Sequence, residues 1–406
     1  MATVYRAPWV LPIAQPPIRD GWVAVQDGLI IGVGAGPAPL PTNAEFVQVD
    51  GAILPGLINA HTHLEFSYLR GRIPPAARFG NWVRAVLENR GRYADPADPA
   101  IVVPAREAIV EAINSGTALL GDVSNTLVTV PLLRERGVCA QVFYELTGFT
   151  EPNPEERVRE ARLRVNAAAS GSVRVSVAPH APYSVSESLL RAIRADIDAH
   201  PTAVSTVHLG EMREEVELLR DGSGDIRKVL EELGRWPNDW RPPGVGPVEY
   251  LASIGVLDSR ILAVHGVQFN RDDLQRLRQL GVTVVSCPRS NTHVGVGSPP
   301  LEAFYTAGVD VAFGTDSLAS VADLNMFSEL QEARRIAPSI SARRLLESAV
   351  RTGARALGFG DELGAIEVGK RAALIAVSIP ADVMDVEEYL LTGIGPHDIR
   401  WLGACA

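Results

Sequence analysis

The sequence predicts an α/β fold, a (β/α)8 barrel of the TIM type that carries a small β-sandwich built from both ends of the chain. From residue 53 onward, short apolar runs alternate with longer segments of helical period, which is typical of repeated βα units around a parallel sheet. Eight such runs can be counted, the number that closes a barrel. A doubly wound open sheet is the alternative, but no glycine-rich phosphate loop follows the first run.

Residues 1–52 are expected to form the first part of the small domain. Two apolar runs, 21–25 and 29–34, flank the tripeptide Gln26-Asp27-Gly28. An Asp-Gly pair between two such runs is a strong signal for a hairpin. The segment holds no histidine, so we interpret it as structural.

Residues 53–357 are expected to form the barrel, and residues 358–406 return to short strands that complete the small domain. The runs interpreted as strands are 52–60, 117–123, 138–146, 173–178, 203–207, 261–264, 282–286 and 309–313. Amphipathic stretches predict helices at 80–90, 155–169, 186–199, 271–280, 325–336 and 342–357.

The composition excludes several classes of function. The chain of 406 residues carries a formal net charge of -10 and has no basic run, which argues against a nucleic-acid partner. It shows no apolar stretch of membrane-spanning length and no secretion signal near Met1, so we expect no membrane partner and a cytoplasmic location. A homo-oligomer is compatible with this composition.

The first predicted barrel strand ends in two histidines. Residues 54–63 read Leu-Pro-Gly-Leu-Ile-Asn-Ala-His-Thr-His, with His61 and His63 two positions apart. On a strand both side chains project to the same face, so both imidazoles can converge on one point. Imidazole is the commonest protein ligand for a borderline divalent metal, although two core histidines held by hydrogen bonds would give the same pattern.

Further polar residues follow other predicted strands. His180 follows the fourth, His208 and Glu211 the fifth, His265 the sixth and Asp316 the eighth. In a (β/α)8 barrel the loops after the strands meet on one face, where the chemistry lies. We therefore expect these side chains to lie close together.

These motifs in combination resemble the amidohydrolase superfamily, and within it the mononuclear deaminases and chlorohydrolases that act on cyclic amidines. The resemblance runs from residues 54–63 through Gly314-Thr315-Asp316 and returns at residues 363–370. It implies that the metal ligands are His61, His63, His208 and Asp316, and that the acid/base groups are Glu211, His265 and Asp316.

The resemblance also implies a single metal. Binuclear relatives need a carboxylated lysine after the fourth strand, where this chain has Ala178-Pro179-His180. We expect one divalent ion, Zn²⁺, with Fe²⁺ as the alternative, because both metals use the same His and Asp ligands.

The chemistry can also be argued from the residues themselves. Deamination of an aromatic amidine needs a nucleophile that adds to a ring carbon at neutral pH, and a divalent metal provides it by lowering the pKa of a water. His265 and Asp316 would accept the water proton, and Glu211 would protonate the ring nitrogen next to the attacked carbon. The alternatives are structural, because His265 could close a strand as a core residue and Glu211 could begin a solvated helix.

Substrate contacts are predicted from the loops. Residues 65–90 hold an aromatic group that could form a lid over a planar ring or could pack a helix on the barrel, namely Phe66, Tyr68, Phe79 and Trp82. The other candidates are Arg72 and Arg289 for a carboxylate, Glu88 and Glu145 for ribose hydroxyls, and His180 and Asn291 for further contacts.

One segment bears on the substrate. Pro179-His180-Ala181-Pro182-Tyr183 resembles the Pro-His-Ser-Pro-Tyr segment of adenosine-type nucleoside deaminases. This favours a small heterocyclic substrate of the 6-aminopurine nucleoside class, with 6-amino-6-deoxyfutalosine of menaquinone biosynthesis as the best match. The alternative is removal of chloride or amine from an s-triazine or another cyclic amidine. A non-catalytic scaffold is disfavoured, because every ligand and acid/base residue is present.

Overall fold

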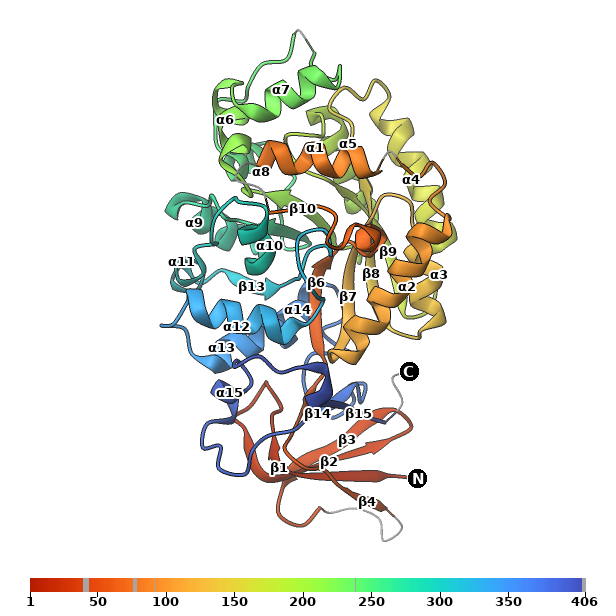
Figure 1. The fold of residues 1–406 in the computed structure, drawn as a ribbon, viewed down its shortest axis with the longest axis vertical. Helices are drawn as coiled ribbons and strands as arrows, with labels where there is room; N and C mark the ends of the chain where they lie inside the picture. The colour runs from red at the N-terminus through yellow and green to blue at the C-terminus, as the bar shows by residue number, and fades with distance from the viewer. Residues whose placement is uncertain (39–43, 76–78, 91, 238, 404–406) are drawn as a thin grey trace.

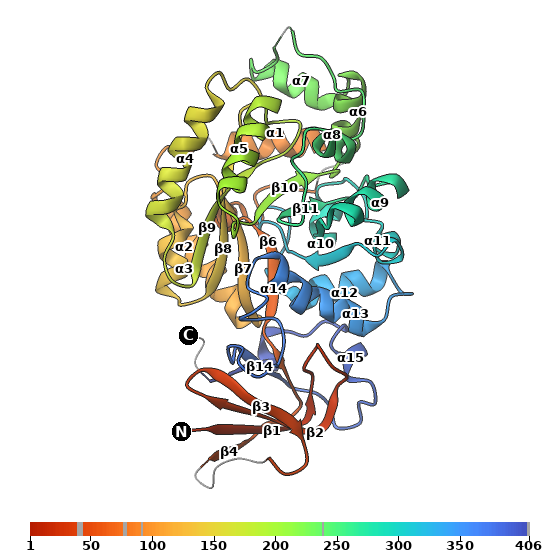
Figure 2. The ribbon, with the colours of Figure 1, turned by 180° about the vertical axis from the view of Figure 1, so that it is seen from behind.

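The computed structural model describes residues 1–38, 44–75, 79–90, 92–237 and 239–403. A small β domain lies at one end of the molecule, and the barrel with its helices makes up the rest (Figures 1 and 2). Strands from both ends of the chain meet in the small domain. The fold is therefore α/β, with parallel sheets flanked by helices.

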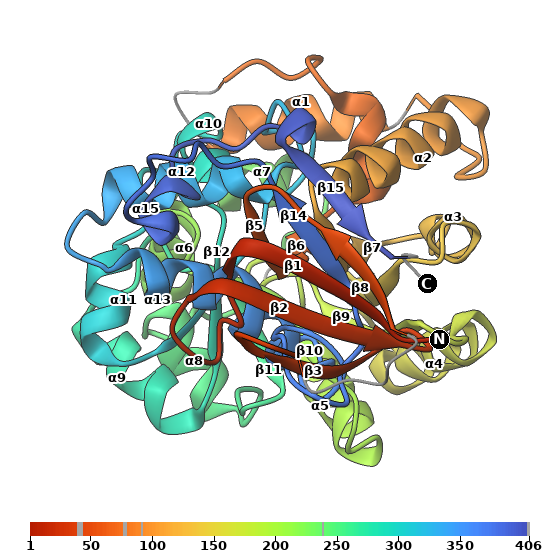
Figure 3. The ribbon, with the colours of Figure 1, turned by 90° about the horizontal axis from the view of Figure 1, so that it is seen from below.

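The small domain is a single mixed sheet of seven strands. The strands are β1 (Thr3–Val10), β2 (Ile18–Gln26), β3 (Leu29–Ala35), β4 (Glu45–Gln48), β5 (Ala52–Pro55), β14 (Leu374–Val377) and β15 (Ile399–Leu402). Their order is β15-β14-β5-β1-β2-β3, and β4 pairs with β1. Figure 3 shows the sheet from below, in front of the barrel. The sequence predicts a sandwich of two stacked layers, whereas the structure has one continuous sheet. This sheet encloses an apolar cluster that includes Val23, Ile53 and Leu374.

A tight hairpin joins β2 and β3. Asp27 and Gly28 form its turn, with φ of 51° and 76°. Two successive left-handed residues match the type I′ turn that Asp-Gly pairs favour. The pairing of β2 with β3 confirms the hairpin that the sequence predicts.

The eight parallel strands of the barrel form two sheets of four. The first sheet holds β6 (Leu57–Thr62), β7 (Thr117–Ser124), β8 (Cys139–Leu146) and β9 (Val173–Pro179). The second holds β10 (Ser205–Leu209), β11 (Ile261–His265), β12 (Thr283–Ser286) and β13 (Asp310–Phe313).

The two sheets meet along two lines, which we call the seams. At the β9/β10 seam the backbone N of His208 donates to the carbonyl of His180 at 2.9 Å. At the β13/β6 seam the backbone N of Asp316 donates to the carbonyl of His61 at 3.0 Å. Each seam is thus closed next to residues that the sequence assigns to the site.

Helices cover the outside of the barrel. Their bounds are α1 (Phe79–Arg90), α2 (Pro99–Asn114), α3 (Thr129–Glu135), α4 (Pro154–Ala168), α5 (Glu187–Ala199), α6 (Arg213–Asp221), α7 (Asp225–Glu232), α8 (Pro247–Ser253), α9 (Arg271–Leu280), α10 (Pro288–His293), α11 (Leu301–Ala307), α12 (Met326–Ile336), α13 (Ala342–Glu347), α14 (Gly353–Ala356) and α15 (Val386–Tyr389), with short helices η1 (Leu64–Leu69), η2 (Ser348–Thr352) and η3 (Pro396–Asp398). Within the described residues, no helix is both long and apolar enough to cross a membrane.

The first barrel strand differs from its prediction. The apolar run 52–60 is divided at Gly56 into β5, which belongs to the small sheet, and β6, which belongs to the barrel. A Cβ on Gly56 would lie 2.6 Å from Ala118 and 2.8 Å from Trp401, so only glycine fits where the chain passes between the sheets. The small sheet therefore reaches Pro55, beyond the expected boundary at residue 52.

The helix predicted over 342–357 is also divided. A π-helical turn, η2, separates α13 from α14. Gly353 begins α14, and a Cβ there would lie 2.9 Å from Ile58 of β6. The turn lets the helix pack closely against the strand that carries His61, because π-turns change the direction of a helix.

Candidate metal centre and catalytic site

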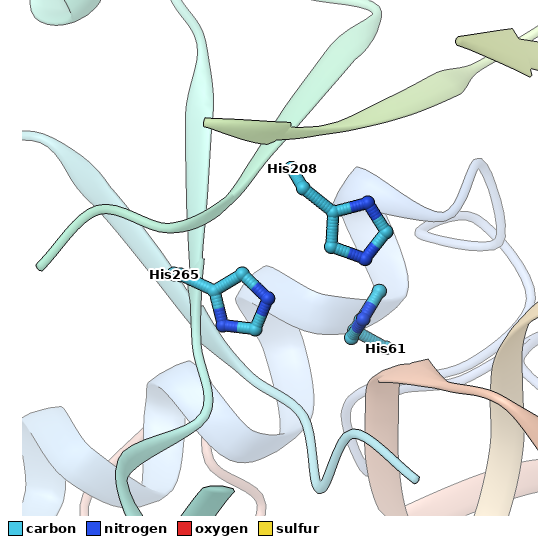
Figure 4. Close-up of side chains that lie close together, drawn as sticks. All are labelled: His61, His208 and His265. Atoms are coloured by element: carbon cyan, nitrogen blue, oxygen red, sulfur yellow. The ribbon is translucent and has the colours of Figure 1, made fainter. Parts of the chain in front are cut away.

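Histidines from three barrel strands meet at one end of the barrel. His61 comes from β6, His208 from β10 and His265 from the last position of β11. Figure 4 shows the three rings close together. The ring centroid of His61 lies 5.0 Å from that of His208 and 5.7 Å from that of His265. The barrel thus brings together residues that are far apart in the sequence.

The environment of His61 fits a metal ligand. The residue is fully buried, and neither ring nitrogen has a hydrogen-bond partner among the residues that the structure describes. A buried polar atom without a partner costs about 1–3 kcal/mol, which coordination would offset. Nε2 of His61 lies 3.8 Å from Oδ1 of Asp316, and Nε2 of His63 lies 3.6 Å from the same oxygen. Two imidazoles and a carboxylate are donors that suit a divalent ion.

His208 extends this donor set. Its Nδ1 donates to the carbonyl of His180 at 2.9 Å, so Nε2 of the neutral ring carries no proton. That Nε2 lies 3.3 Å from Nε2 of His63. Two imidazole nitrogens that face each other so closely are suited to bind one cation between them.

The pKa values of these histidine rings also suit metal binding. Burial, followed by the charges of neighbouring rings, lowers the pKa of His61 and His63 well below 6.5. Burial lowers the pKa of His180 and His208 to about 4. The rings are therefore neutral at physiological pH, which is the form that binds a metal.

Hydrogen bonds orient the carboxylate of Asp316. Its Oδ1 accepts from the backbone N of Ser317 at 2.8 Å, and its Oδ2 accepts from Oγ of Ser290 at 2.6 Å. Burial raises the pKa of Asp316 to about 6, while these hydrogen bonds favour the charged form. The side chain is thus held in one orientation beside the histidines.

The predicted acid/base residues lie side by side. Nε2 of His265 lies 3.7 Å from Oε1 of Glu211, and Nδ2 of Asn291 lies 3.0 Å from Nδ1 of His265. Burial, followed by repulsion from Asp316 and Glu215, raises the pKa of Glu211 well above its ordinary value. This raised pKa favours the protonated form of the carboxyl, which is the form that a general acid uses.

A cavity of about 360 Å³ adjoins these residues. Its polar end is lined by His63, His180, His208, Glu211, His265 and Asp316. Its apolar wall comes from α1 and α7, with Trp82, Val86, Leu87, Ile226, Val229 and Leu230. An apolar cavity of this size with a few convergent polar groups is typical of a small-molecule site.

The structure places the predicted substrate contacts unequally. Trp82, Glu145 and His180 line the cavity. Arg72 and Glu88 are exposed and do not line it, so these two predictions are not met. Glu88 lies on the solvent face of α1, because that helix turns positions 82, 83, 86 and 87 toward the cavity. Phe66 also lines the cavity, whereas the side chain of Phe79 lies outside the described residues.

Two other predicted contacts have different partners. Nε of Arg289 donates to Oε1 of Glu329 at 2.7 Å, and its Nη1 donates to Oδ1 of Asp323 at 2.8 Å. The guanidinium is therefore occupied by carboxylates of the chain itself and does not face the cavity. Asn291 contacts the ring of His265 and is absent from the cavity lining.

The sequence reasoning missed Arg90. Its guanidinium lines the cavity, lies 4.5 Å from the ring centre of Phe66, and donates from Nη2 to Oδ1 of Asn125 at 2.9 Å. The signal was present in the spacing, because Trp82, Val86 and Arg90 are four residues apart and share one helix face.

Comparisons with known proteins place the chain in a family. Residues 52–390 match the model of the amidohydrolase family. A 5-methylthioadenosine/S-adenosylhomocysteine deaminase from Halobacterium salinarum is 32% identical over 409 residues, covering 94% of this chain and 86% of the relative. An aminodeoxyfutalosine deaminase from Deinococcus radiodurans is 32% identical over 326 residues, covering 77% of this chain and 74% of the relative. A zinc-bound adenosine deaminase structure from Xanthomonas campestris superposes with a TM-score of 0.82 at 27% identity, over 98% of this chain and 90% of that one. The chain therefore belongs to the amidohydrolase family.

Proposed function

We propose that this chain is a metal-dependent hydrolase that releases ammonia from the 6-aminopurine ring of a 5′-modified nucleoside. The observation that carries the proposal is the position of the buried Glu211 carboxyl, which lies beside His265 at the polar end of the cavity and next to donors for a divalent metal. Relatives that are named as deaminases of adenosine derivatives support the same class of reaction.

The proposed metal ligands are His61, His63, His208 and Asp316. We propose Zn²⁺, in line with the zinc-bound relative, and keep Fe²⁺ as the alternative. A divalent ion held there supplies an activated water at neutral pH.

The residues of the chain itself move the protons. Asp316 and His265 face the cavity and accept the proton of the attacking water. Glu211 gives its proton to the ring nitrogen beside the attacked carbon, so that the ring can accept electrons. The amino group then takes the proton held by Asp316 or His265, the C–N bond breaks and ammonia leaves. Glu211 regains a proton from the added hydroxyl, which becomes the ring carbonyl.

Within this substrate class we propose 6-amino-6-deoxyfutalosine as the first substrate to test. Among the described residues, Arg90 donates a hydrogen bond only to Asn125, which leaves N–H groups for a carboxylate. The apolar wall of α1 and α7 suits an aromatic substituent on the ribose. The competing substrates are 5′-methylthioadenosine and S-adenosylhomocysteine, after the names of the relatives.

The test measures ammonia release and the ultraviolet change from adenine to hypoxanthine with metal-replete protein. We expect turnover of one of these adenine nucleosides and a fall in kcat of about 10²–10⁴ in Glu211→Gln, because proton transfer is lost. Ser186→Ala is the matched control, since it removes only the hydrogen bonds of the N-cap hydroxyl of α5, which accepts from the backbone N of Leu189 and bonds with Oγ of Ser188.

Other outcomes of the same panel are decisive. If a chlorotriazine is added to the substrates with chloride release as its readout, turnover of that compound alone would replace the purine assignment with another cyclic amidine. A bound metal without any turnover would contradict the purine assignment, and a protein with neither metal nor turnover would be a scaffold.

A further inference from the structure

Glu211 and His265 lie on two turns that are joined to each other. The turn after β10 carries Glu211, and the turn after β11 follows His265. The backbone N of Gly266 donates to the carbonyl of Leu209 at 3.1 Å. A shift of one turn therefore moves the other, and with it the contact between the two acid/base side chains.

One aromatic ring packs against both turns. Gly210 and Gly266 have φ of 62° and 63°, which favours glycine at each position. A Cβ on Gly210 would lie 2.5 Å from the ring of Phe269, and a Cβ on Gly266 would lie 2.7 Å from the same ring. The two turns and the ring thus form one close-packed unit without space for adjustment.

A second carboxyl holds the first of these turns. Glu215 lies in the first turn of α6 and is fully buried. Its Oε2 accepts from the backbone N of Glu211 at 3.1 Å, and the backbone N of Gly210 also donates to this carboxyl. The other oxygen, Oε1, has no partner within the described residues. The carboxyl therefore fixes the direction in which the chain leaves β10, because it satisfies two buried backbone donors.

We infer that Glu215 is a positioning residue for the proposed deamination, which acts by holding Glu211 against His265. The inference rests on the proposed function. Glu215 does not line the cavity, so it has no contact with a substrate there. Without its carboxyl, two backbone N–H groups lose their partner and the turn loses its anchor. Oε1 of Glu211 then no longer stays 3.7 Å from Nε2 of His265.

The test compares Glu215→Gln with Glu215→Leu in the full-length, metal-replete enzyme. The amide oxygen of Gln still accepts from both N–H groups, so we expect kcat to stay within about threefold of the wild-type value. Leu accepts from neither, and we expect kcat to fall by about tenfold or more with KM unchanged, since only proton transfer is affected.

A double-mutant cycle distinguishes positioning from general damage. In the Glu211→Gln background, Glu215→Leu should lower kcat by less than about twofold, because the carboxyl that it positions is already absent. An equal loss in both backgrounds, or a change in KM alone, would overturn the inference. Glu215→Asp, which is one methylene too short to hold both N–H groups, replaces the Leu variant if that protein does not fold.

The positioning role and the proposed function can fail separately. Wild-type turnover that Glu215→Leu leaves unchanged rejects the positioning role and keeps the deaminase. Absence of turnover by the wild-type enzyme on every adenine nucleoside rejects the proposed function and the positioning role with it. Ser186→Ala again controls for the loss of side-chain hydrogen bonds at the start of a helix.

Discussion

Two site residues have backbone conformations that residues other than glycine rarely adopt. The φ angle is 79° at His265 and 62° at Asp316. Such conformations cost about 1–3 kcal/mol each and persist only where the surroundings hold them. The backbone N of Asp316 is bonded to the carbonyl of His61, and Asn291 contacts the ring of His265. The chain is therefore less stable than it could be, because these two residues are held in conformations that orient their side chains toward the cavity.

Asp122 makes stability depend on pH. It is fully buried, its Oδ1 accepts from the backbone N of Leu64 at 2.9 Å, and its Oδ2 accepts from Oγ1 of Thr129 at 2.6 Å. Burial raises its pKa from 3.8 to about 7, so between these values the folded chain holds a proton that the unfolded chain has lost. Its contribution to stability is therefore fully present below about pH 4 and is lost as the pH rises toward about 7.

Asp122→Asn keeps the shape of the side chain and removes this titration. The measured quantity is the free energy of unfolding of Asp122→Asn minus that of the wild type, from urea titrations. We expect this difference to be larger at about pH 8 than at about pH 5, because only the wild type loses stability between these values through Asp122. Asp198→Asn is the control, because arginine partners lower the pKa of Asp198 to about 2, outside this window. An Asp122→Asn difference that does not change with pH would contradict the assignment.

Arg90 is expected to select the substituent of the nucleoside. Arg90→Met should raise KM for a substrate with a carboxylate by about tenfold or more, because a charge-assisted hydrogen bond is worth about 1.5–3 kcal/mol. KM for 5′-methylthioadenosine should change by less than about twofold. Arg92→Met changes an exposed arginine outside the cavity lining and should affect neither value. An equal rise in KM for both substrates would exclude a carboxylate contact.

Helices α1 and α7 act as one element, because together they form the apolar wall of the cavity. An ion pair joins them, since Nε and Nη2 of Arg84 donate to the two carboxylate oxygens of Glu232, both at 2.9 Å. The pair is exposed, so its contribution to stability is small and weakens with salt. We expect this two-point contact to hold the two helices at a fixed distance.

Charge reversal tests this link between the helices. Arg84→Glu should raise KM about two- to fivefold at low salt, and the added change Glu232→Arg should restore it. Both variants should match the wild type at high salt, where exposed charges are screened. A double variant that is no better than Arg84→Glu would show that the ion pair does not shape the wall.

Elements that depend on local sequence patterns can be predicted from the sequence, whereas features that depend on contacts between distant residues cannot. Short apolar runs bounded by turns predict the barrel strands, because burial on both faces leaves a local pattern. The division at Gly56 is not local, since the apolar pattern continues across it and only contact with Trp401 requires the glycine. Arg289 is a similar case. The sequence assigns it to a substrate carboxylate because nothing local reveals its partner Glu329, which lies 40 residues away. The proposed ligands and acid/base residues could be grouped from the sequence because each lies at or just after the end of a barrel strand.

The whole molecule couples its small domain to the site through one strand. β5 pairs with β1 and β14 of the small sheet, and after Gly56 the chain continues as β6, which carries His61. Nε1 of Trp401 on β15 donates to the carbonyl of Ile113 on α2 at 2.8 Å, a further link between the domains. The small domain therefore anchors the strand that begins the site.

Metal removal should destabilise the whole barrel. The proposed ligands come from both halves of the barrel, because His61 lies on β6 with His63 directly after it, whereas His208 lies on β10 and Asp316 in the loop after β13. A ligand at 100 times its Kd stabilises a protein by about 2.7 kcal/mol, so chelation should lower Tm and added Zn²⁺ should restore it in calorimetry. Glu211→Gln should keep this response because Glu211 is not a proposed ligand. An unchanged Tm after chelation would contradict the metal centre.

The seams have a consequence for amide hydrogen exchange. The backbone N–H groups of His208 and Asp316 close the two seams, and both residues are proposed ligands. In the loaded protein these two amides should exchange as slowly as those inside either sheet, and in the metal-free protein as quickly as those of surface loops. Two amide protons within the barrel wall would then report directly on the occupancy of the centre.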